Sequence, residues 1–393
     1  MNDQRVPEPT RGFPEQEFAT RTDAAQQAMR AQGLDAILVM TEPEVRYFSG
    51  FLTPFWQSPT RPWFLVIPAT GKPVAVIPAI GAAVMERTWL DDVHTWSSPN
   101  PEDEGISILT DVLRGIAAGS KSIGVPMGPE TQIRMPLLDF ERLKSALPNH
   151  SFIDATPIIR ELRMTKSETE IGKIGHVCSL MSTVFETLPN FVHTGMSETD
   201  IFREFKKAAL DQGVDDVAYL VGGVGQGGLE DIISPPSSQQ AQAGDILMLD
   251  TGATFDGYFC DFDRNYAFGH ADDAVKRAYE IVFKATNAGL DAARPGARCE
   301  DIFHAMQSVM DAGGALGNDV GRIGHGLGMQ LTEWPSHRPG DTTELNSGMV
   351  ITLEPGMEFV PGKVMVHEEN IVIRDGSPEL LSRRAPAELP IIG

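Results

Sequence analysis

The stretch LDTGATFDGYFCDFD, Leu249 to Asp263, organises the rest of the sequence. Its pattern predicts two β-strands joined by a tight turn that contains Gly257. Because side chains alternate across a strand, Asp250 points away from Leu249, and Asp261 shares a face with Asp263. A carboxylate among apolar strand residues is costly unless it is paired or binds a metal. Two such carboxylates at matched positions on adjacent strands therefore predict a cation between them.

Three later residues extend this pattern. His325 lies among glycines in GHGLG, where the backbone allows close approach. Glu354 ends a strand in ITLEPG, and Glu368 lies in VMVHEENIVI with His367 directed to the opposite face. Four carboxylates and one imidazole suit Mn²⁺, Co²⁺, Fe²⁺ or Zn²⁺. Bridging carboxylates would hold two such ions about 3.5–4 Å apart around a shared water or hydroxide. The predicted ligands of this dinuclear centre are Asp250, Asp261, His325, Glu354 and Glu368.

Composition narrows the class of protein. A chain of 393 residues is long enough for two domains, and 41% hydrophobic residues with 22% charged residues are typical of a globular protein. The formal charge of −22 argues against nucleic acid or an anionic membrane surface as a partner. The polar N-terminus resembles no signal peptide, no apolar run would span a membrane, and the three cysteines are too scattered for a disulfide framework. We expect a soluble, cytoplasmic protein.

The order of the patterns predicts an arm over residues 1–17, an α/β domain over 18–158 and a second domain over 159–393. A helix is expected over Phe18–Gln32, and a hairpin is expected around the turn between Trp63 and Pro78. Near residue 160 the sequence pattern changes, and Ser167 with Glu170 forms a capping-box pattern at the start of an expected helix. Further helices are expected at about 198–212, 274–293 and 300–312.

An aromatic stretch, VRYFSGFLTPFWQSPTRPWF, covers residues 45–64. Two interpretations remain open for it. It is either a loop that packs on the core of its own domain, or a loop that closes over a pocket, including a pocket of a second subunit.

At this point the sequence resembles a known family. From about residue 160 to 382 it is similar to the pita-bread enzymes methionine aminopeptidase, prolidase, aminopeptidase P and creatinase, and GLDAILV with VRYFSGF resembles the creatinase/prolidase N-terminal domain. The resemblance implies an α/β N-terminal domain, an α+β pita-bread catalytic domain and the same five metal ligands. It also implies that Glu354 shuttles a proton, and that two subunits pair as a homodimer with the aromatic stretch reaching the partner.

The sequence departs from this family at three positions. The peptidases carry a histidine seven residues after the GHG histidine, where this chain has Thr332, and a histidine before the first metal strand, where EDIISPPSSQ has none. Asp263 stands where Thr or Ser is common, and it either supports a ligand, adds a ligand or contacts a cationic substrate. His337 either takes over for the missing histidines, if its loop folds over the site, or is an exposed loop residue.

Three functions follow from these observations. The first is a metal-dependent hydrolase of the Xaa-Pro dipeptidase and aminopeptidase P group, which cleaves a peptide or amide C–N bond with a hydroxide that bridges two divalent metal ions. The second is a hydrolase or lyase for a small non-peptide molecule, such as a compatible solute or dimethylsulfoniopropionate, and Thr332 favours it. The third is a non-catalytic binding protein on the same scaffold, against which the complete ligand set argues.

Overall fold

The computed structural model describes residues 7–58, 61–317 and 321–393. The chain forms two compact units, an N-terminal unit of residues 10–163 and a C-terminal unit of residues 164–393, and the described residues 7–9 belong to the second unit. The expected division after residue 158 falls inside α6 (Thr156–Met164), and the units divide after Arg163 in the same helix. Part of the expected arm lies outside the described residues. The first helix starts at Glu15 rather than Phe18, with Pro14 preceding its first turn.

The N-terminal unit is built on one six-stranded sheet with the strand order β4-β3-β2-β1-β5-β6. The pairs β1–β2 and β2–β3 are antiparallel, which confirms the expected hairpin, and the other neighbours are parallel. Its strands are β1 (Ala36–Val39), β2 (Phe64–Pro68), β3 (Val74–Pro78), β4 (Asp92–Trp96), β5 (Ser122–Val125) and β6 (Ser151–Asp154). Its other helices are α1 (Glu15–Gln32), α2 (Glu42–Ser49), η1 (Phe55–Gln57), η2 (Ala79–Gly81), α3 (Ala82–Met85), α4 (Ile106–Ile116) and α5 (Leu137–Ala146).

Within this unit the aromatic stretch packs mainly on its own core. Its first residues belong to α2 and are therefore helical rather than part of a loop. The Phe51 and Trp63 rings lie 5.1 Å apart and are buried, and the Trp56 ring lies 5.8 Å from Trp63. Leu52 and Phe55 remain exposed. Residues 59 and 60 of the stretch lie outside the described residues.

The C-terminal unit contains two larger sheets and a hairpin. One sheet has the order β18-β10-β8-β7 with β9 paired to β8, the second has the order β12-β11-β13-β16-β17, and β14 pairs with β15. The strands of the first sheet are β7 (Asp216–Gln226), β8 (Asp245–Phe255), β9 (Tyr258–Phe259), β10 (Phe262–Phe268) and β18 (Ile391–Ile392). The other strands are β11 (His325–Gly326), β12 (Glu333–Ser336), β13 (Val350–Leu353), β14 (Gly356–Val360), β15 (Lys363–Val366), β16 (Glu369–Val372) and β17 (Glu379–Leu380).

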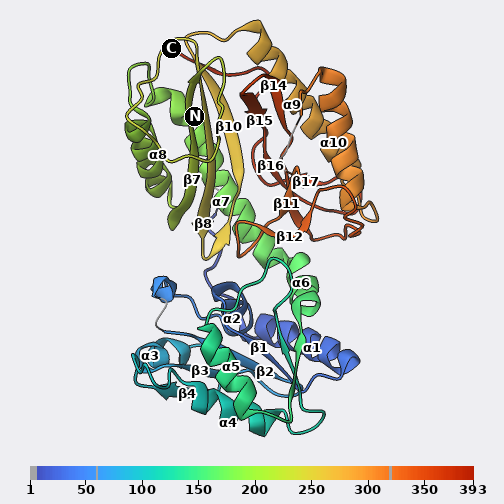
Figure 1. Cartoon of the computed structure of the whole chain (residues 1–393). Helices are drawn as coiled ribbons and strands as arrows, with labels where there is room; N and C mark the ends of the chain where they lie inside the picture. The colour runs from blue at the N-terminus through green and yellow to red at the C-terminus, as the bar shows by residue number, and fades with distance from the viewer. Residues whose placement is uncertain (1–6, 59–60, 318–320) are drawn as a thin grey trace. The chain divides into compact units, whose positions relative to one another are not determined.

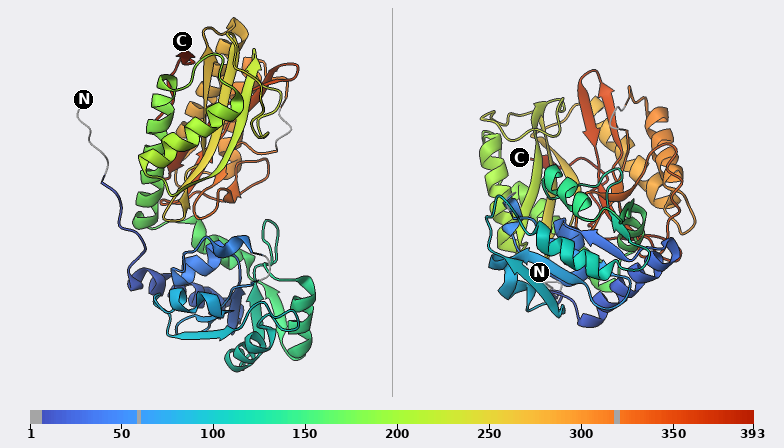
Figure 2. Two further views of the ribbon diagram at one scale, coloured as in Figure 1. Left: turned by 90° about the vertical axis from the view of Figure 1, so that its left-hand side faces the viewer. Right: turned by 60° about the horizontal axis from the view of Figure 1, so that its bottom comes forward.

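Two pairs of helices cover these sheets from outside (Figure 1). Helices α7 and α8 lie against β8 and β7, as Figure 2 also shows, whereas α9 packs against β13–β15 and α10 packs on α9. The expected helices and the Ser167–Glu170 capping box are confirmed. No helix in the described ranges has both the length and the apolar character needed to cross a membrane. The remaining helices are α7 (Glu168–Thr187), η3 (Leu188–Asn190), α8 (Glu198–Gln212), α9 (Asp273–Ala292) and α10 (Cys299–Gly313).

Helix α7 fixes the turn that joins β8 to β9. This turn is the Asp256–Gly257 pair, where both residues have positive φ, as a two-residue hairpin turn requires. The ammonium of Lys173, a fully buried residue of α7, forms an ion pair with the Asp256 carboxylate. The Tyr258 hydroxyl donates to Glu170 of the same helix at 2.9 Å. The strands that carry the predicted ligands are therefore held by polar contacts as well as by apolar packing.

Replacing Lys173 with Met tests this anchor. The substitution leaves the Asp256 carboxylate buried without its ammonium partner, and we expect the free energy of unfolding to fall by about 3–5 kcal/mol. Urea unfolding followed by circular dichroism measures the change. The matched control is Lys207→Met, which removes an exposed ion pair with Glu204 on α8 and should have little effect. Equal losses in the two variants would contradict the anchoring role.

Candidate metal centre

The first two predicted ligands come from the strands around the Asp-Gly turn. Asp250 lies within β8, and its direct cross-strand partner on β10 is Asp263. Asp261 lies in the short break between β9 and β10. We expected Asp250 and Asp261 to lie opposite each other on adjacent strands, and this is wrong. Asp261 lies in the break before β10, so Asp263 is the residue that pairs with Asp250. All three carboxylates nevertheless influence one another electrostatically, so they occupy one site.

The other three predicted ligands come from the second sheet. His325 begins β11, Glu354 directly follows β13, and Glu368 directly precedes β16. Because β11, β13 and β16 are adjacent in the sheet, these positions lie close together. The Thr352 hydroxyl accepts a hydrogen bond from the His325 backbone at 3.1 Å and fixes this ligand strand against β13.

The surroundings of Gly324 explain why a glycine must precede His325. Its φ is +137°, and an added Cβ would lie 2.4 Å from the Thr352 carbonyl oxygen and 2.6 Å from the His337 ring. Any side chain here would therefore push the neighbouring backbone away and displace His325.

The centre is compact. Asp261, His325 and Glu368 each offer a ligand atom, and these atoms lie within 4.8 Å of one another. The His325 Nε2 atom is 3.4 Å from Asp261 Oδ2 and 3.9 Å from Glu354 Oε2. The Nδ1 atom of His325 is 2.9 Å from the Gly326 carbonyl, which favours a proton on Nδ1 and leaves Nε2 free to bind a metal. The imidazole is neutral near pH 7, because burial lowers the pKa of His325 to about 4.

The carboxylates raise one another's proton affinity. Burial raises the pKa of Asp250 to about 6, and burial with the charge of Asp250 raises the pKa of Glu354 to about 8. Burial and then the neighbouring carboxylates place the pKa of Asp261 and of Glu368 well above the ordinary value. The Glu354 side chain is 33% exposed, so water moderates its shift. These shifts have the sign expected of a site that lacks positive charge.

The donor atoms fit a divalent metal centre. Within the described part of the chain, Asp250 Oδ1 and Glu368 Oε1 are buried without a hydrogen-bond partner. Buried carboxylate oxygens without a partner are costly, and a cation would satisfy both. Oxygen donors with one imidazole suit Mn²⁺, Fe²⁺, Co²⁺ or Zn²⁺ better than a thiophilic ion. The nearby Cys260 thiol is protonated, because burial raises its pKa to about 12.

The remaining predicted site residues lie around this centre. Asp263 is almost fully buried, and its pKa is raised by burial and then by Asp250. Thr332 is exposed at the edge of β12. His337 follows β12 and is fully buried, so the interpretation as an exposed loop residue is wrong. Burial lowers the pKa of His337 to about 3, and the imidazole of His325 is close enough to lower it further.

Three residues of the site carried little or no sequence signal. The Tyr219 hydroxyl, on β7, hydrogen-bonds to Asp250, and burial followed by the charge of Asp250 raises the pKa of this tyrosine. Arg322 contacts the Thr332 hydroxyl. Strand alternation along VMVHEENIVI puts Asn370 on the same face as Glu368, and this is the one usable sequence signal among the three.

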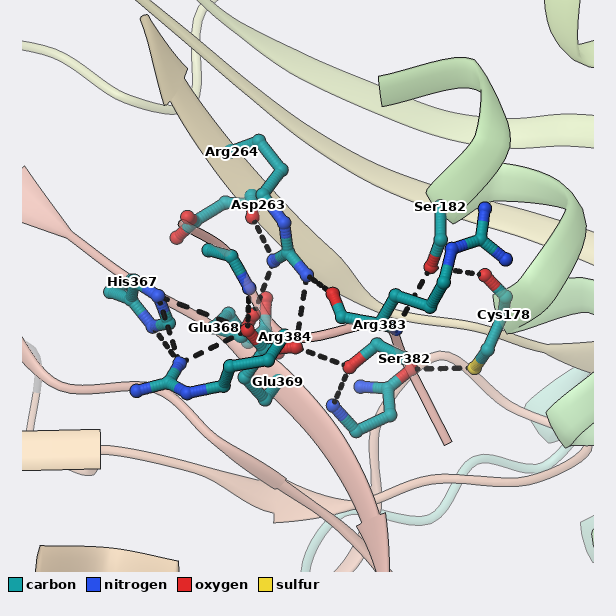
Figure 3. Close-up of polar contacts among 12 residues, drawn as sticks. Cys178, Ser182, Asp263, Arg264, His367, Glu368, Glu369, Ser382, Arg383 and Arg384 are labelled. Atoms are coloured by element: carbon teal, nitrogen blue, oxygen red, sulfur yellow. Dashed lines mark hydrogen bonds and ion pairs between the residues drawn. The ribbon is translucent and has the colours of Figure 1, made fainter. Parts of the chain in front are cut away.

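Arg264 ties the two sheets together beside the centre (Figure 3). From β10, its Nη1 atom donates to the carbonyl of Asp263 at 2.6 Å and to the carbonyl of Glu368 at 2.8 Å. Its Nη2 atom pairs with the Glu369 carboxylate at 2.9 Å. Burial alone would raise the pKa of Glu369, but Arg264, His367 and Arg384 outweigh it and lower this pKa to about 2. Arg264 therefore holds the Glu369 carboxylate beside the centre, and His367 faces this network.

Asn370 holds Asp261 from the opposite sheet. Its Oδ1 atom accepts from the Asp261 backbone N–H at 2.9 Å, and its Nδ2 atom donates to the Asp261 carbonyl. The Cys178 thiol donates to the same Oδ1 atom at 3.2 Å. In the break between β9 and β10, the Asn370 side chain therefore makes the hydrogen bonds that a paired strand would otherwise make. These bonds fix the backbone of Asp261, a predicted ligand.

Comparison with known proteins identifies the class. The model of metallopeptidase family M24 matches residues 172–375, and the model of the creatinase/prolidase N-terminal domain matches residues 21–165. The chain belongs to metallopeptidase family M24. It is a metallopeptidase with the two-domain α/β fold expected from its sequence, and its family implies divalent metal ions as cofactors.

Individual relatives cover nearly the whole chain. It is 28% identical to the probable dipeptidase PepE of Mycobacterium tuberculosis over 388 residues, which are 98% of this chain and 99% of the relative. The crystal structure of dipeptidase PepE from Mycobacterium ulcerans is similar with a TM-score of 0.84 at 26% identity, covering 97% and 99% of the two chains. A prolidase from Thermococcus sibiricus gives a TM-score of 0.85 at 25% identity, covering 95% and 99%.

Metal binding should release protons. Because the pKa values of Asp250 and Glu354 are raised to about 6 and about 8, part of these groups is protonated at pH 7, and an ion must displace those protons. We expect the affinity for Mn²⁺ to fall about tenfold per pH unit and per proton as the pH is lowered from 8 to 6. Calorimetric titration in buffers of different ionisation enthalpy counts the protons. A heat independent of the buffer would contradict the expectation, and Asp250→Asn should release fewer protons.

The Asn370 contacts predict a second effect. We expect Asn370→Ala to weaken Mn²⁺ binding about 10–100-fold, because the Asp261 backbone loses both of its side-chain partners. Calorimetric titration measures the affinity, and circular dichroism checks that the fold is retained. The matched control is Cys178→Ala, which removes the thiol but keeps both Asn370 contacts with Asp261. An affinity for Mn²⁺ that is unchanged in Asn370→Ala would show that the strand break is rigid without this side chain.

Proposed function

We propose that this protein is a metal-dependent dipeptidase of the prolidase-like group that hydrolyses the peptide bond of short peptides. Its centre would hold two divalent ions through Asp250, Asp261, His325, Glu354 and Glu368. The observation that carries the proposal is the convergence of these five side chains from two sheets onto one buried site. The names of the relatives, two dipeptidases and a prolidase, support the substrate class.

The ions, once bound, would polarise the scissile carbonyl and supply a nucleophile from water at neutral pH. Side chains of the protein would carry out the other steps. Glu354 is suited to move a proton, because its side chain is 33% exposed against 5% for His325 and 6% for Asp261. Tyr219 would donate a hydrogen bond to the Asp250 carboxylate, and Asp263 lies directly opposite Asp250 on the neighbouring strand. His337 is buried and neutral, and we assign it a supporting role behind His325 instead of contact with the substrate.

Three further expectations belong to this proposal: the compartment, the oligomeric state and the metal. The three cysteines are free and buried, which suits a reducing compartment such as the cytoplasm. The exposed apolar side chains of Leu52 and Phe55, in the aromatic stretch, offer a surface for a second copy of the chain, and we propose a homodimer. Among the suitable ions we propose Mn²⁺, since oxygen donors dominate the site.

A substrate panel tests the function. The Mn²⁺-loaded protein is assayed with dipeptides that carry proline or another residue second, with N-acyl amino acids, and with compatible solutes. We expect dipeptide hydrolysis, and a loss of at least about 1,000-fold in Asp250→Asn, since this variant removes the charge of a proposed metal ligand. Asp200→Asn, on the exposed face of α8, is the control.

Two outcomes would revise the proposal. Turnover of a non-peptide solute without any dipeptide cleavage would support the hydrolase or lyase alternative, which the threonine at position 332 favours. A monomer in sedimentation velocity would contradict the proposed dimer.

A further inference from the structure

A buried ion pair fastens the segment that joins β11 to β12, residues 327–332, called here the β11–β12 segment. The ammonium of Lys166 lies 3.1 Å from Oε2 of Glu333, and the two side chains are 2% and 6% exposed. Lys166 directly precedes the N-cap of α7, and Glu333 is the first residue of β12. The pair therefore joins the start of α7 to a part of the chain that is far away in sequence.

Further contacts hold both members of this pair. The backbone N–H of Lys166 donates to the Gly348 carbonyl at 2.9 Å. The other carboxylate oxygen of Glu333, Oε1, accepts from the Gln330 N–H at 3.1 Å, within the β11–β12 segment itself. Gly328 leaves the space for this carboxylate, because a Cβ there would lie 2.8 Å from both of its oxygens. The Glu333 carboxylate thus links the segment to the start of α7.

The β11–β12 segment crosses from the second sheet to the first beside the metal centre. The Gly328 carbonyl accepts from the Phe259 N–H at 2.9 Å. Leu331 lies against Gly252 of β8, where an added Cβ would be 2.2 Å from the Leu331 Cδ1 atom. Because side chains alternate along β8, Gly252 shares the face of Asp250. The segment therefore forms part of the border of the site that the predicted ligands make.

A buried ion pair is a weak device for stability alone. Taking both charges out of water offsets much of their attraction, and apolar side chains of similar volume often stabilise a fold as well or better. Such a pair can, however, specify one arrangement of the chain, because the interaction is lost when the two groups move apart. The place of the Lys166–Glu333 pair, behind the border of the metal centre, indicates what it specifies.

We infer that the Lys166–Glu333 pair positions the β11–β12 segment and so keeps the border of the metal centre in the shape that accepts a peptide. This inference rests on the proposed dipeptidase function and deepens it, since it names two buried residues that act on the substrate through the segment. If the segment loosens, only a fraction of the molecules has the accepting shape, and the apparent affinity for substrate falls by that fraction. The pair should therefore affect KM more than kcat.

The test separates position from stability. The double variant Lys166→Met/Glu333→Met replaces the pair by apolar side chains of similar volume, and we expect its urea midpoint to stay close to that of the wild type. Glu333→Gln removes the charge but keeps an acceptor for the Gln330 N–H. Lys166→Arg keeps the charge and should retain most of the wild-type behaviour. Lys284→Met, which removes an exposed ion pair with Glu280 on α9, is the control.

Hydrogen–deuterium exchange reports on the segment without turnover. In the Mn²⁺-loaded double variant we expect the amides of residues 327–332 to exchange at least about tenfold faster than in the wild type, and those of β8 to keep their rate. The affinity for Mn²⁺ should stay within about threefold of the wild type, because no predicted ligand is altered. KM for alanyl-proline should rise about 10–100-fold, while kcat changes less than about threefold.

The results distinguish this inference from the proposed function. If the wild type cleaves no dipeptide, the dipeptidase proposal fails, and the exchange rates still decide whether the pair positions the segment. Unchanged exchange of residues 327–332 in the double variant would overturn the inference, and so would an equal increase over β8, which would make the pair a general support of the fold. A fall in kcat without a rise in KM, or a loss of Mn²⁺ that accounts for the lower activity, would overturn it as well.

Discussion

The structure depends on carboxylates of like charge being held together in a largely buried site. Asp250, Asp261, Asp263, Glu354 and Glu368 reach this site from two sheets, and each has a raised pKa because burial and, for all but Asp250, neighbouring carboxylates oppose ionisation. Folding can tolerate this only if protons or cations offset the repulsion and if the strands are fixed by other contacts. The packing of four helices behind the sheets and the polar contacts between the sheets provide that fixation.

The five residues predicted from the sequence lie close together in the structure, and each sits in a short motif with its own physical reason. Strand alternation placed Asp250 and Glu368 on faces that meet in the fold, and the glycines around His325 indicated close backbone approach. The family resemblance added Glu354 as a proton carrier. The two-domain fold followed from the change in pattern near residue 160, and the family comparison confirms that fold.

Other features depend on contacts that no local pattern reveals. The register between β8 and β10 pairs Asp250 with Asp263, because the break at Asp261 cannot be seen in an alternating sequence. Tyr219 on β7 contacts Asp250 on the adjacent strand β8. Arg322 contacts the Thr332 hydroxyl only because the chain folds back before β12. His337 looked like a loop residue in WPSHRPGD, yet the space left by Gly324 lets it lie fully buried. In each case the partner is distant in sequence, so only the fold brings the pair together.

The contacts of Arg264 and Asn370 have a consequence for metal exchange. Both side chains cross between the sheets and bind main-chain groups of ligand residues, so they do not compete with an ion for the ligand oxygens. The ligand backbone is therefore shaped before any ion arrives, unlike a zinc finger, in which metal binding and folding are one event. A centre built this way can lose one ion and accept another without unfolding. The ion it carries in the cell is then set by local supply and intrinsic affinity, rather than by which metal was present when the chain folded.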